Sequence, residues 1–319
     1  MPITLARTLV LALCALSAAA AAQSYPNRPI RLVVPFPAGG TADLVARAIA
    51  EPLSQSLGQP VVLDNKPGAD GAIAGEIVRT SAPDGYTLFF ATNTPLNATP
   101  TLRKLPPYDP IADFTPVSLL GTFATFLVVS NDLPVRNLND LIAYARTNPG
   151  KVNYATGNTQ SILASAQLKR SERIDLVHVP YKGDVQALPD LATNRVQMMF
   201  ATGVVVPQVK DGRMRAIAAM MPARSPLLPD VPTMAEAGTA SVTIGGWAGL
   251  FGPAGMPADA VSRLNGAVVA TLAKPDVRDA LDKLAFSPQS SSAKEAAAYL
   301  ATQLAAWRLA VAESGIERD

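Results

Sequence analysis

The chain has one cysteine and one histidine among its 319 residues, and both scarcities exclude kinds of chemistry. Because Cys14 lies in the N-terminal segment and has no partner, no disulfide can form, and stability must come from a hydrophobic core. Zinc-type sites need clustered histidine, cysteine or carboxylate ligands, and His178 with scattered acids offers no such cluster. We therefore expect no metal ion and no cofactor.

Charge is also scarce, since only 16% of the residues are charged and the formal net charge is +2. Globular domains usually have about a quarter of their residues charged, so a composition this apolar favours wide hydrophobic burial. There is no basic run of the kind that binds phosphate backbones. We expect no nucleic-acid partner.

The first 22 residues have the pattern of a secretory signal peptide. Arg7 supplies the positive charge, and Leu9–Ala22 is apolar or small throughout, ending in an Ala-Ala-Ala cleavage pattern. This apolar run is short for a membrane span, which disfavours the alternative of a permanent anchor. A lipoprotein is a second alternative, but the bulky Leu13 before Cys14 argues against it. We expect cleavage near Ala22 and export to the periplasm.

The rest of the chain alternates short apolar strand patterns with helix patterns, which favours a parallel α/β architecture. Pro52 should kink or split the first helix. The expected strands are Ile30–Phe36, Val61–Leu63, Thr87–Ala91, Phe126–Val129, Val152–Tyr154, Leu176–Val179, Met198–Phe200, Ala216–Met220 and Trp247–Phe251. The expected helices are Ala42–Leu57, Ala69–Ser81, Leu138–Asn148, Ser161–Ser171, Val185–Thr193, Ala258–Ala273, Pro275–Lys283 and Ala293–Ser314.

Two segments have the character of crossings between lobes. One is Pro116–Thr125, where a strand-like run continues through a glycine, and the other is Arg215–Pro222, before a proline-rich loop. The chain would then build one lobe from residues 23–120 and 222–319 and a second from residues 121–221. A ligand would lie in the cleft between them, where closure can bury it.

A candidate anion site follows the first strand. Arg31–Phe36 leads into Pro37–Gly40, and a helix pattern begins at Thr41. The first turn of a helix has N–H groups without intrahelical partners, and the helix dipole favours a negative charge beside them. Glycines at positions 39 and 40 let a ligand approach the backbone closely. We expect Gly39, Gly40 and Thr41 to hold a carboxylate.

The segment Val152–Ser161 repeats this arrangement of strand, glycine, polar side chains and helix start. Opposed helix starts in two lobes could bind one carboxylate from both sides, with Gly157, Asn158 and Thr159 completing the site. Charge-assisted hydrogen bonds contribute about 1.5–3 kcal/mol each. Ordinary βα connections also carry glycine and capping residues, so that interpretation stays open.

Two titratable residues have a structural and a functional interpretation. Asp43 lies in the first helical turn, where an acid compensates the dipole and caps, although it could also orient a ligand. His178 lies in an apolar strand pattern, which favours a structural role. The chain has no G-x-S-x-G nucleophile elbow. We assign no catalytic residue, and a secreted hydrolase using Asp43 or His178 is the enzyme alternative.

Seven segments together resemble the Bug-type extracytoplasmic solute receptors, the substrate-binding components of tripartite tricarboxylate transporters. The resemblance extends over nearly the whole chain from Tyr25 to the helix around Trp307. The segments that carry it are Val34–Asp43, Asp64–Gly71, Asp84–Leu88, Tyr108–Val117, His178–Gly183, Leu228–Gly238 and Trp247–Pro257.

The resemblance implies a type II periplasmic binding protein fold, with two α/β lobes, two hinge crossings and a ligand cleft. It implies a monomer that binds a small organic carboxylate and delivers it to membrane permease subunits. A receptor that presents ligand to a membrane-bound kinase is an alternative. The implied ligand-binding residues are Phe36, Ala38, Gly39, Gly40, Thr41, Asp43, Thr92, Asn93, Thr156, Gly157, Asn158, Thr159, Gln160, Ser161, Ala201 and Thr202.

This chain departs from the family pattern in its second loop. The family usually has a small Gly/Ser-rich run followed by a His-Leu pair, whereas this chain has the bulkier, amide-rich Gly157–Leu163. Because the departure lies in the implied pocket, it bears on the kind of ligand rather than on the fold.

Overall fold

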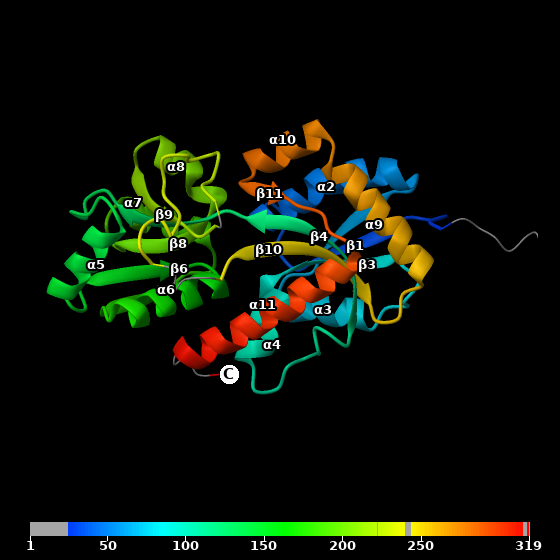
Figure 1. Ribbon diagram of the computed structural model, residues 1–319, viewed down its shortest axis with the longest axis horizontal. Helices are drawn as coiled ribbons and strands as arrows, with labels where there is room; N and C mark the ends of the chain where they lie inside the picture. Colours follow the sequence, from blue (N-terminus) through cyan, green and yellow to red (C-terminus); the bar gives the residue numbers. More distant parts are fainter. Residues whose placement is uncertain (1–24, 222, 240–243, 315–317, 319) are drawn as a thin grey trace, which may run out of the picture.

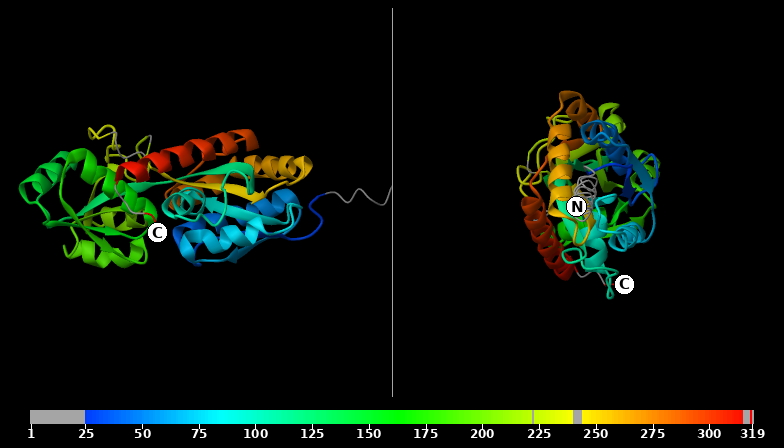
Figure 2. Two further views of the ribbon diagram at one scale, coloured as in Figure 1. Left: turned by 90° about the horizontal axis from the view of Figure 1, so that it is seen from below. Right: turned by 90° about the vertical axis from the view of Figure 1, so that its right-hand side faces the viewer.

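The computed structural model describes residues 25–221, 223–239, 244–314 and 318, and shows an elongated molecule of two lobes (Figure 1). The expected signal segment, its alternatives and its cleavage position lie outside these residues. Each lobe contains one β-sheet with helices on both faces, and the lobes lie side by side along the long axis (Figure 2).

The first lobe has a six-stranded sheet in the order β11-β4-β10-β3-β1-β2. Its central strands carry apolar side chains on both faces, as strands covered on both sides do, and Ile30 to Val34 contains only one residue that is not buried. The strands are β1 (Ile30–Val34), β2 (Val61–Asn65), β3 (Thr87–Thr92), β4 (Phe114–Phe123), β10 (Gly246–Pro253) and β11 (Phe286–Pro288).

The second lobe has a five-stranded sheet in the order β7-β6-β8-β5-β9. Apolar clusters on its two faces separate it from the first lobe as a folding unit of its own. The strands are β5 (Thr125–Ser130), β6 (Val152–Thr156), β7 (Leu176–Pro180), β8 (Met198–Thr202) and β9 (Met214–Ala219).

The eight expected helices are present, the short helices Thr99–Leu102 and Val206–Lys210 were not expected, and Pro52 does not split the first helix, which runs unbroken from Thr41 to Leu57. Helices α2, α9 and α10 cover one face of the first sheet, and α3 and α11 lie over the other (Figures 1 and 2). The helices are α2 (Thr41–Leu57), α3 (Ala72–Arg79), α4 (Thr99–Leu102), α5 (Leu138–Thr147), α6 (Thr159–Glu172), α7 (Asp184–Ala192), α8 (Val206–Lys210), α9 (Ala258–Leu272), α10 (Pro275–Lys283) and α11 (Ala293–Ser314).

Both sheets are mixed, so the expected parallel arrangement holds for only part of each sheet. β1 runs parallel to β2 and β3, and β6 runs parallel to β7 and β8. β10 is antiparallel to β3 and β4, and β5 is antiparallel to β8 and β9. The antiparallel strands adjoin the two crossings, because a chain that leaves a lobe and returns to it must reverse direction there.

The crossings lie at Ala124, between β4 and β5, and just before Gly246, where β10 begins. β4 belongs to the first sheet up to Phe123, three residues beyond the expected boundary at residue 120. After β9, Leu228, Val231 and Met234 pack on the second lobe's core. These three residues of the loop between β9 and β10 thus pack with the second lobe.

A small apolar cluster joins the lobes behind the crossings. Leu163 of the second lobe packs with Ala98, Ile244, Trp307 and Val311, and α11 contributes the last two. The long C-terminal helix lies alongside both lobes in two views (Figures 1 and 2). This cluster therefore connects the two lobes through buried apolar side chains.

Candidate functional site

The loops that follow β1 and β6 lie at the facing edges of the two sheets. β3 ends at Thr92, which pairs with Ala248 near the start of β10, beside the crossing. β8 ends at Thr202, which pairs with Thr125, the first residue after the other crossing. Because β1 is parallel to β3 and β6 to β8, the carboxyl ends of all four strands point toward the opposite lobe. Ligands of open α/β sheets bind outside such ends.

Asp43 fixes the conformation of the first loop. Its side chain is fully buried, and Oδ2 accepts hydrogen bonds from the Gly39 N–H and from Arg47 Nε, both at 2.8 Å. Oδ1 accepts from Asn65 Nδ2 at 2.9 Å, and the same amide donates to the Phe36 carbonyl at 3.0 Å. Asp43 therefore binds the loop directly at Gly39 and, through the Asn65 amide, at Phe36.

The carboxylate of Asp43 stays ionised. Burial by itself would raise its pKa, but hydrogen bonds from Arg47, Gly39 and Asn65 and the charge of Arg47 hold the pKa below its usual value. Both oxygens are occupied by protein donors. The structural interpretation of Asp43 thus fits the geometry, because its carboxylate binds groups of the protein itself.

Of the three residues expected to hold a carboxylate, only Thr41 has an N–H group without a partner among the residues that the structure describes. The Gly39 N–H is taken by Asp43, and the Gly40 N–H points to the Pro37 carbonyl at 3.4 Å. Within the described residues, the N–H groups of Thr41 and Ala42 have no hydrogen-bond partner. These are the first two helical positions of α2, where the positive end of the dipole lies.

The second loop also leaves N–H groups without partners, but its helix has a side-chain cap, which α2 lacks. Asn158 caps α6, with its Oδ1 accepting from the Ser161 N–H at 2.9 Å, while the Ser161 hydroxyl reciprocates at the Asn158 N–H. Ser161 is thus a capping residue rather than a ligand contact. The N–H groups of Thr159 and Gln160 have no partner in the part of the chain that the structure describes.

Asp184, which the sequence analysis did not select, lies at the centre of the second loop's contacts. Its Oδ1 accepts from Asn158 Nδ2 at 3.0 Å, and its Oδ2 accepts from the Thr202 N–H at 2.8 Å and the Thr202 hydroxyl at 2.9 Å. A Cβ on Gly157 would lie 2.2 Å from the Asp184 nitrogen, so only glycine fits there. The signal in the sequence that could have indicated Asp184 is its position, as an acid that follows the Lys182-Gly183 pair shortly after strand β7.

Asp184 is 8% exposed, and burial raises its pKa, although the hydrogen bonds from Thr202 and Asn158 oppose the rise. Both carboxyl oxygens face groups that donate, namely an amide N–H₂, a backbone N–H and a hydroxyl. This donor set matches the ionised form, since two of the three groups cannot accept a proton in return.

Gln160 lies where the two lobes and both crossings meet. Its Nε2 donates to the Thr125 hydroxyl at 3.2 Å and to the Ile244 carbonyl at 3.1 Å. Its Oε1 accepts from Asn93 of the first lobe at 3.4 Å. Gln160 and Asn93 are 7% and 4% exposed, so their side chains are buried where the two lobes meet.

The other predicted residues occupy less accessible positions. Ala201 is fully buried in β8, and Thr92 and Thr156 are 2% exposed at the ends of their strands. Phe36 is half-buried and Ala38 is exposed on the first loop. The structure therefore gathers all the predicted positions at the facing edges, but several side chains point into the protein.

His178 lies on the edge strand β7, as the strand pattern predicts, and is more exposed than the partly buried structural position we expect from the sequence. Its ring stacks on Tyr154 with centroids 5.0 Å apart, and Nε2 lies 2.6 Å from the Thr156 hydroxyl. Desolvation lowers its pKa. No described acid hydrogen-bonds to the ring, so the pair lacks the orienting third group of a nucleophilic triad.

The described residues contain neither a metal-binding cluster nor a helix that could span a membrane. No group of three or more histidine, cysteine or acidic residues there could hold a metal ion. None of the described helices combines the length and apolar content that crossing a bilayer requires.

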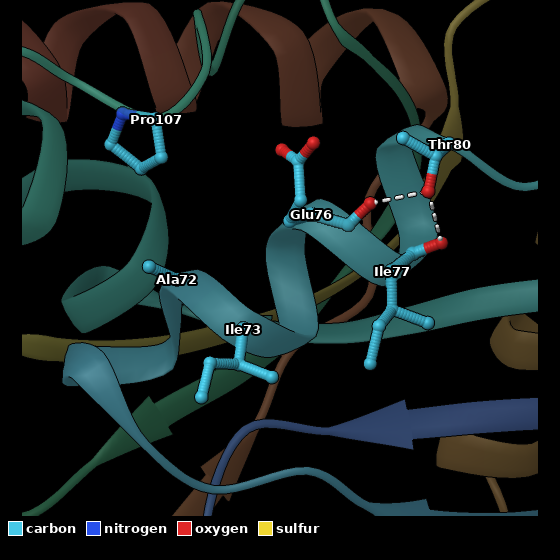
Figure 3. Close-up of a pocket in the computed structure, with 6 residues that line it drawn as sticks. All are labelled: Ala72, Ile73, Glu76, Ile77, Thr80 and Pro107. Atoms are coloured by element: carbon cyan, nitrogen blue, oxygen red, sulfur yellow. Dashed lines mark hydrogen bonds between the residues drawn. The ribbon is translucent and has the colours of Figure 1, made fainter.

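A hollow on the first lobe lies outside this arrangement. It is lined by α3 and the loop before β4, with Thr80 donating to the Glu76 and Ile77 carbonyls beside it (Figure 3). All the residues that line it belong to the first lobe. We assign it no ligand. Its six lining residues are Ala72, Ile73, Glu76, Ile77, Thr80 and Pro107.

Two α/β lobes joined by two crossings, with helix starts facing each other across the gap, define the class of periplasmic binding proteins. The chain belongs to the tripartite tricarboxylate transporter family receptors, whose model matches residues 45–316. It is a solute-binding receptor of the Bug type, and the fold class expected from the resemblance is confirmed.

Three similar proteins illustrate the family. The protein BugT of Bordetella pertussis is 32% identical over 313 residues, covering 96% of this chain and 95% of BugT. The structure of Rpa4515 of R. palustris with adipate has a TM-score of 0.84 at 32% identity, covering 92% and 99% of the two chains. MatC of Rhodopseudomonas palustris with bound malate has a TM-score of 0.79 at 32% identity, covering 90% and 100%.

Proposed function

We propose that this receptor captures a small organic carboxylate between its lobes in the periplasm and delivers it to membrane permease subunits of a tripartite transporter. The observation that carries the proposal is the pair of opposed helix starts, each with at least two N–H groups that have no partner within the described residues. Support comes from the similar structures that hold adipate and malate.

The proposed contacts are the N–H groups of Thr41 and Ala42 in the first lobe and of Thr159 and Gln160 in the second. Each pair lies at the positive end of a helix dipole, where an anion is stabilised. Four charge-assisted hydrogen bonds of about 1.5–3 kcal/mol each would cover the about 8 kcal/mol of a micromolar complex. Backbone donors leave the side chains of the loops free to set the loop shape.

Gly39 and Gly40 have different roles in this proposal. Gly39 has a φ of +83°, so glycine is favoured there by conformation, and its N–H orients toward Asp43. Gly40 has an ordinary φ of −74° and keeps the approach to Thr41 open, since a Cβ there would meet only the Pro37 carbonyl at 3.5 Å. A larger residue at position 40 therefore fits the backbone but enters the ligand's space.

The receptor would bind without transforming its ligand, and it would act as a monomer that closes by a hinge. We place the lobe boundaries at Ala124 and at Gly245, where the chain passes from one sheet to the other. Binding at facing edges supports closure, because a ligand held by both helix starts stabilises the closed form over the open one.

Gly40→Val tests the proposed site. A thermal-shift screen of organic acids on the mature protein identifies a binder, and calorimetry then compares the variant with Gly266→Val, an exposed position on α9 of the same lobe with open space around its Cα. We expect Gly40→Val to fold, as circular dichroism would show, and to lose at least about 100-fold in affinity, while Gly266→Val binds normally. Equal affinities in both variants would remove the site from the first loop.

A further inference from the structure

The two buried acids behind the loops, Asp43 and Asp184, differ in whether a positively charged side chain pairs with them. Asp43 of the first lobe forms an ion pair with Arg47, with Nε and Oδ2 2.8 Å apart. Asp184 of the second lobe forms no ion pair within the described residues, and its three partners are all neutral groups. Lys182 is close in sequence but exposed and forms no ion pair with it. The first loop therefore balances its acid with a cation, whereas the acid of the second loop is held by neutral donors alone.

Asp184 also occupies the polar groups that the second lobe would otherwise offer to a ligand. Asn158 and Thr202 were predicted ligand contacts, and the side-chain amide of Asn158 and both donors of Thr202 donate to Asp184. A second ligand carboxylate near Thr202 would find these donors already used by an anion of the protein. It would also be placed close to a like charge in a poorly solvated site.

We infer that Asp184 sets the charge of the ligand, so that the second lobe rejects a second carboxylate and the receptor selects an acid with one. The inference rests on the proposed function and names its substrate class. The carboxylate of the ligand would lie between the two helix starts, where Thr159 and Gln160 retain free N–H groups. The end of the ligand nearer Thr202 would be neutral or positively charged.

Matched acids test the inference in the wild-type mature protein. Butyrate with succinate, hexanoate with adipate, and benzoate with terephthalate are pairs that differ chiefly in the second carboxylate. For the pair that binds, we expect the monoacid to bind at least about tenfold more tightly, as a repulsion of two nearby charges predicts. The half-amide of the diacid should also bind more tightly than the diacid itself, which requires no variant.

Asp184→Asn then separates charge from structure, because it removes the charge and keeps an oxygen acceptor. We expect the monoacid preference to fall by about tenfold or to invert. Asp140→Asn is the matched control, since it removes the same charge at the start of α5, which follows the far end of β5 in the same lobe. The preference should not change in that variant.

The outcomes separate the inference from the proposal beneath it. A wild-type protein that binds the diacid at least as tightly as both monoacid and half-amide would overturn the inference and leave carboxylate binding intact. An unchanged preference in a folded Asp184→Asn variant would also overturn it. Absence of binding to every acid, mono or di, would overturn the proposed function itself.

Discussion

Asn93 of the first lobe and Gln160 of the second face each other where the two lobes meet, with Nδ2 and Oε1 3.4 Å apart. The same Gln160 side chain donates to Thr125 after one crossing and to Ile244 before the other. A single amide thus contacts both lobes and both connections between them. It lies directly beside the N–H groups proposed to bind the ligand, so ligand binding and lobe geometry meet at one residue.

Replacing Gln160 with leucine should destabilise the protein by about 1–3 kcal/mol. The volume is similar, but the buried Ile244 carbonyl loses its donor, and a buried group without a partner is costly. Urea unfolding measures the change, with the exposed Gln186→Leu on α7 as the control. A change within error of that control would mean that the amide does not stabilise the crossings.

Asp43→Ala should weaken the proposed ligand binding although Asp43 would not touch the ligand. Without the carboxylate, the Gly39 N–H and the Asn65 amide lose their acceptor, and the loop is no longer fixed. We expect a loss of about 1–3 kcal/mol in unfolding free energy. Calorimetry should show a lower affinity, whereas Glu51→Ala on the exposed face of the same helix should keep both values. Unaltered affinity in Asp43→Ala would contradict the role of the loop.

The stability that Asp43 contributes should depend on pH. Its pKa is lower in the folded protein than in the unfolded chain, so the unfolded chain takes up a proton first as pH falls. The contribution is complete above about pH 4, the unfolded value, and is lost as pH falls through the lower folded value. The difference in unfolding free energy between wild type and Asp43→Ala should therefore shrink between pH 7 and pH 3. A difference that stays constant would show that the ionised form is not favoured.

Gly157→Ala should disrupt the second loop. The added Cβ would lie 2.2 Å from the Asp184 nitrogen and 2.4 Å from the Gly183 carbonyl carbon, so backbone must move. We expect a loss of about 3 kcal/mol and of ligand binding. Gly266→Ala is the contrasting substitution, because the exposed helical position has free space and should gain about 0.5–1 kcal/mol. Thermal unfolding of both variants gives the comparison.

Most of the fold could be predicted from periodicity, because strands such as β1 and helices such as α10 carry local signals that packing does not override. One strand, β11, escaped prediction, and β4 was predicted only in part, as the strand-like crossing Pro116–Thr125. β11 has only three residues, Phe286–Pro288, and β4 is interrupted by Pro116 and Gly121, which are breaker signals. Gly121 is tolerated there with a φ of +147°, where a Cβ would lie 2.2 Å from the Ser287 carbonyl oxygen. Close approach of β11 explains that glycine, and no local pattern reveals it.

For the candidate site, the sequence could indicate two loops but not the contacts of their atoms, and the site itself stays a prediction. Glycines and a helix start mark a place for an anion, and both loops do lie at facing edges. The sequence could not show that Asp43 takes the Gly39 N–H, because that bond depends on the fold of the turn. Nor could it reveal Asp184, whose partners Asn158 and Thr202 lie on other elements and meet it only in three dimensions.

A crystal structure of the mature protein with the best-binding acid tests the central claim most directly. The expected result is one carboxylate between the lobes, with its oxygens within about 3.2 Å of the Thr41 and Ala42 nitrogens on one side and of the Thr159 and Gln160 nitrogens on the other. A carboxylate held by one lobe only, or bound away from both helix starts, would contradict it.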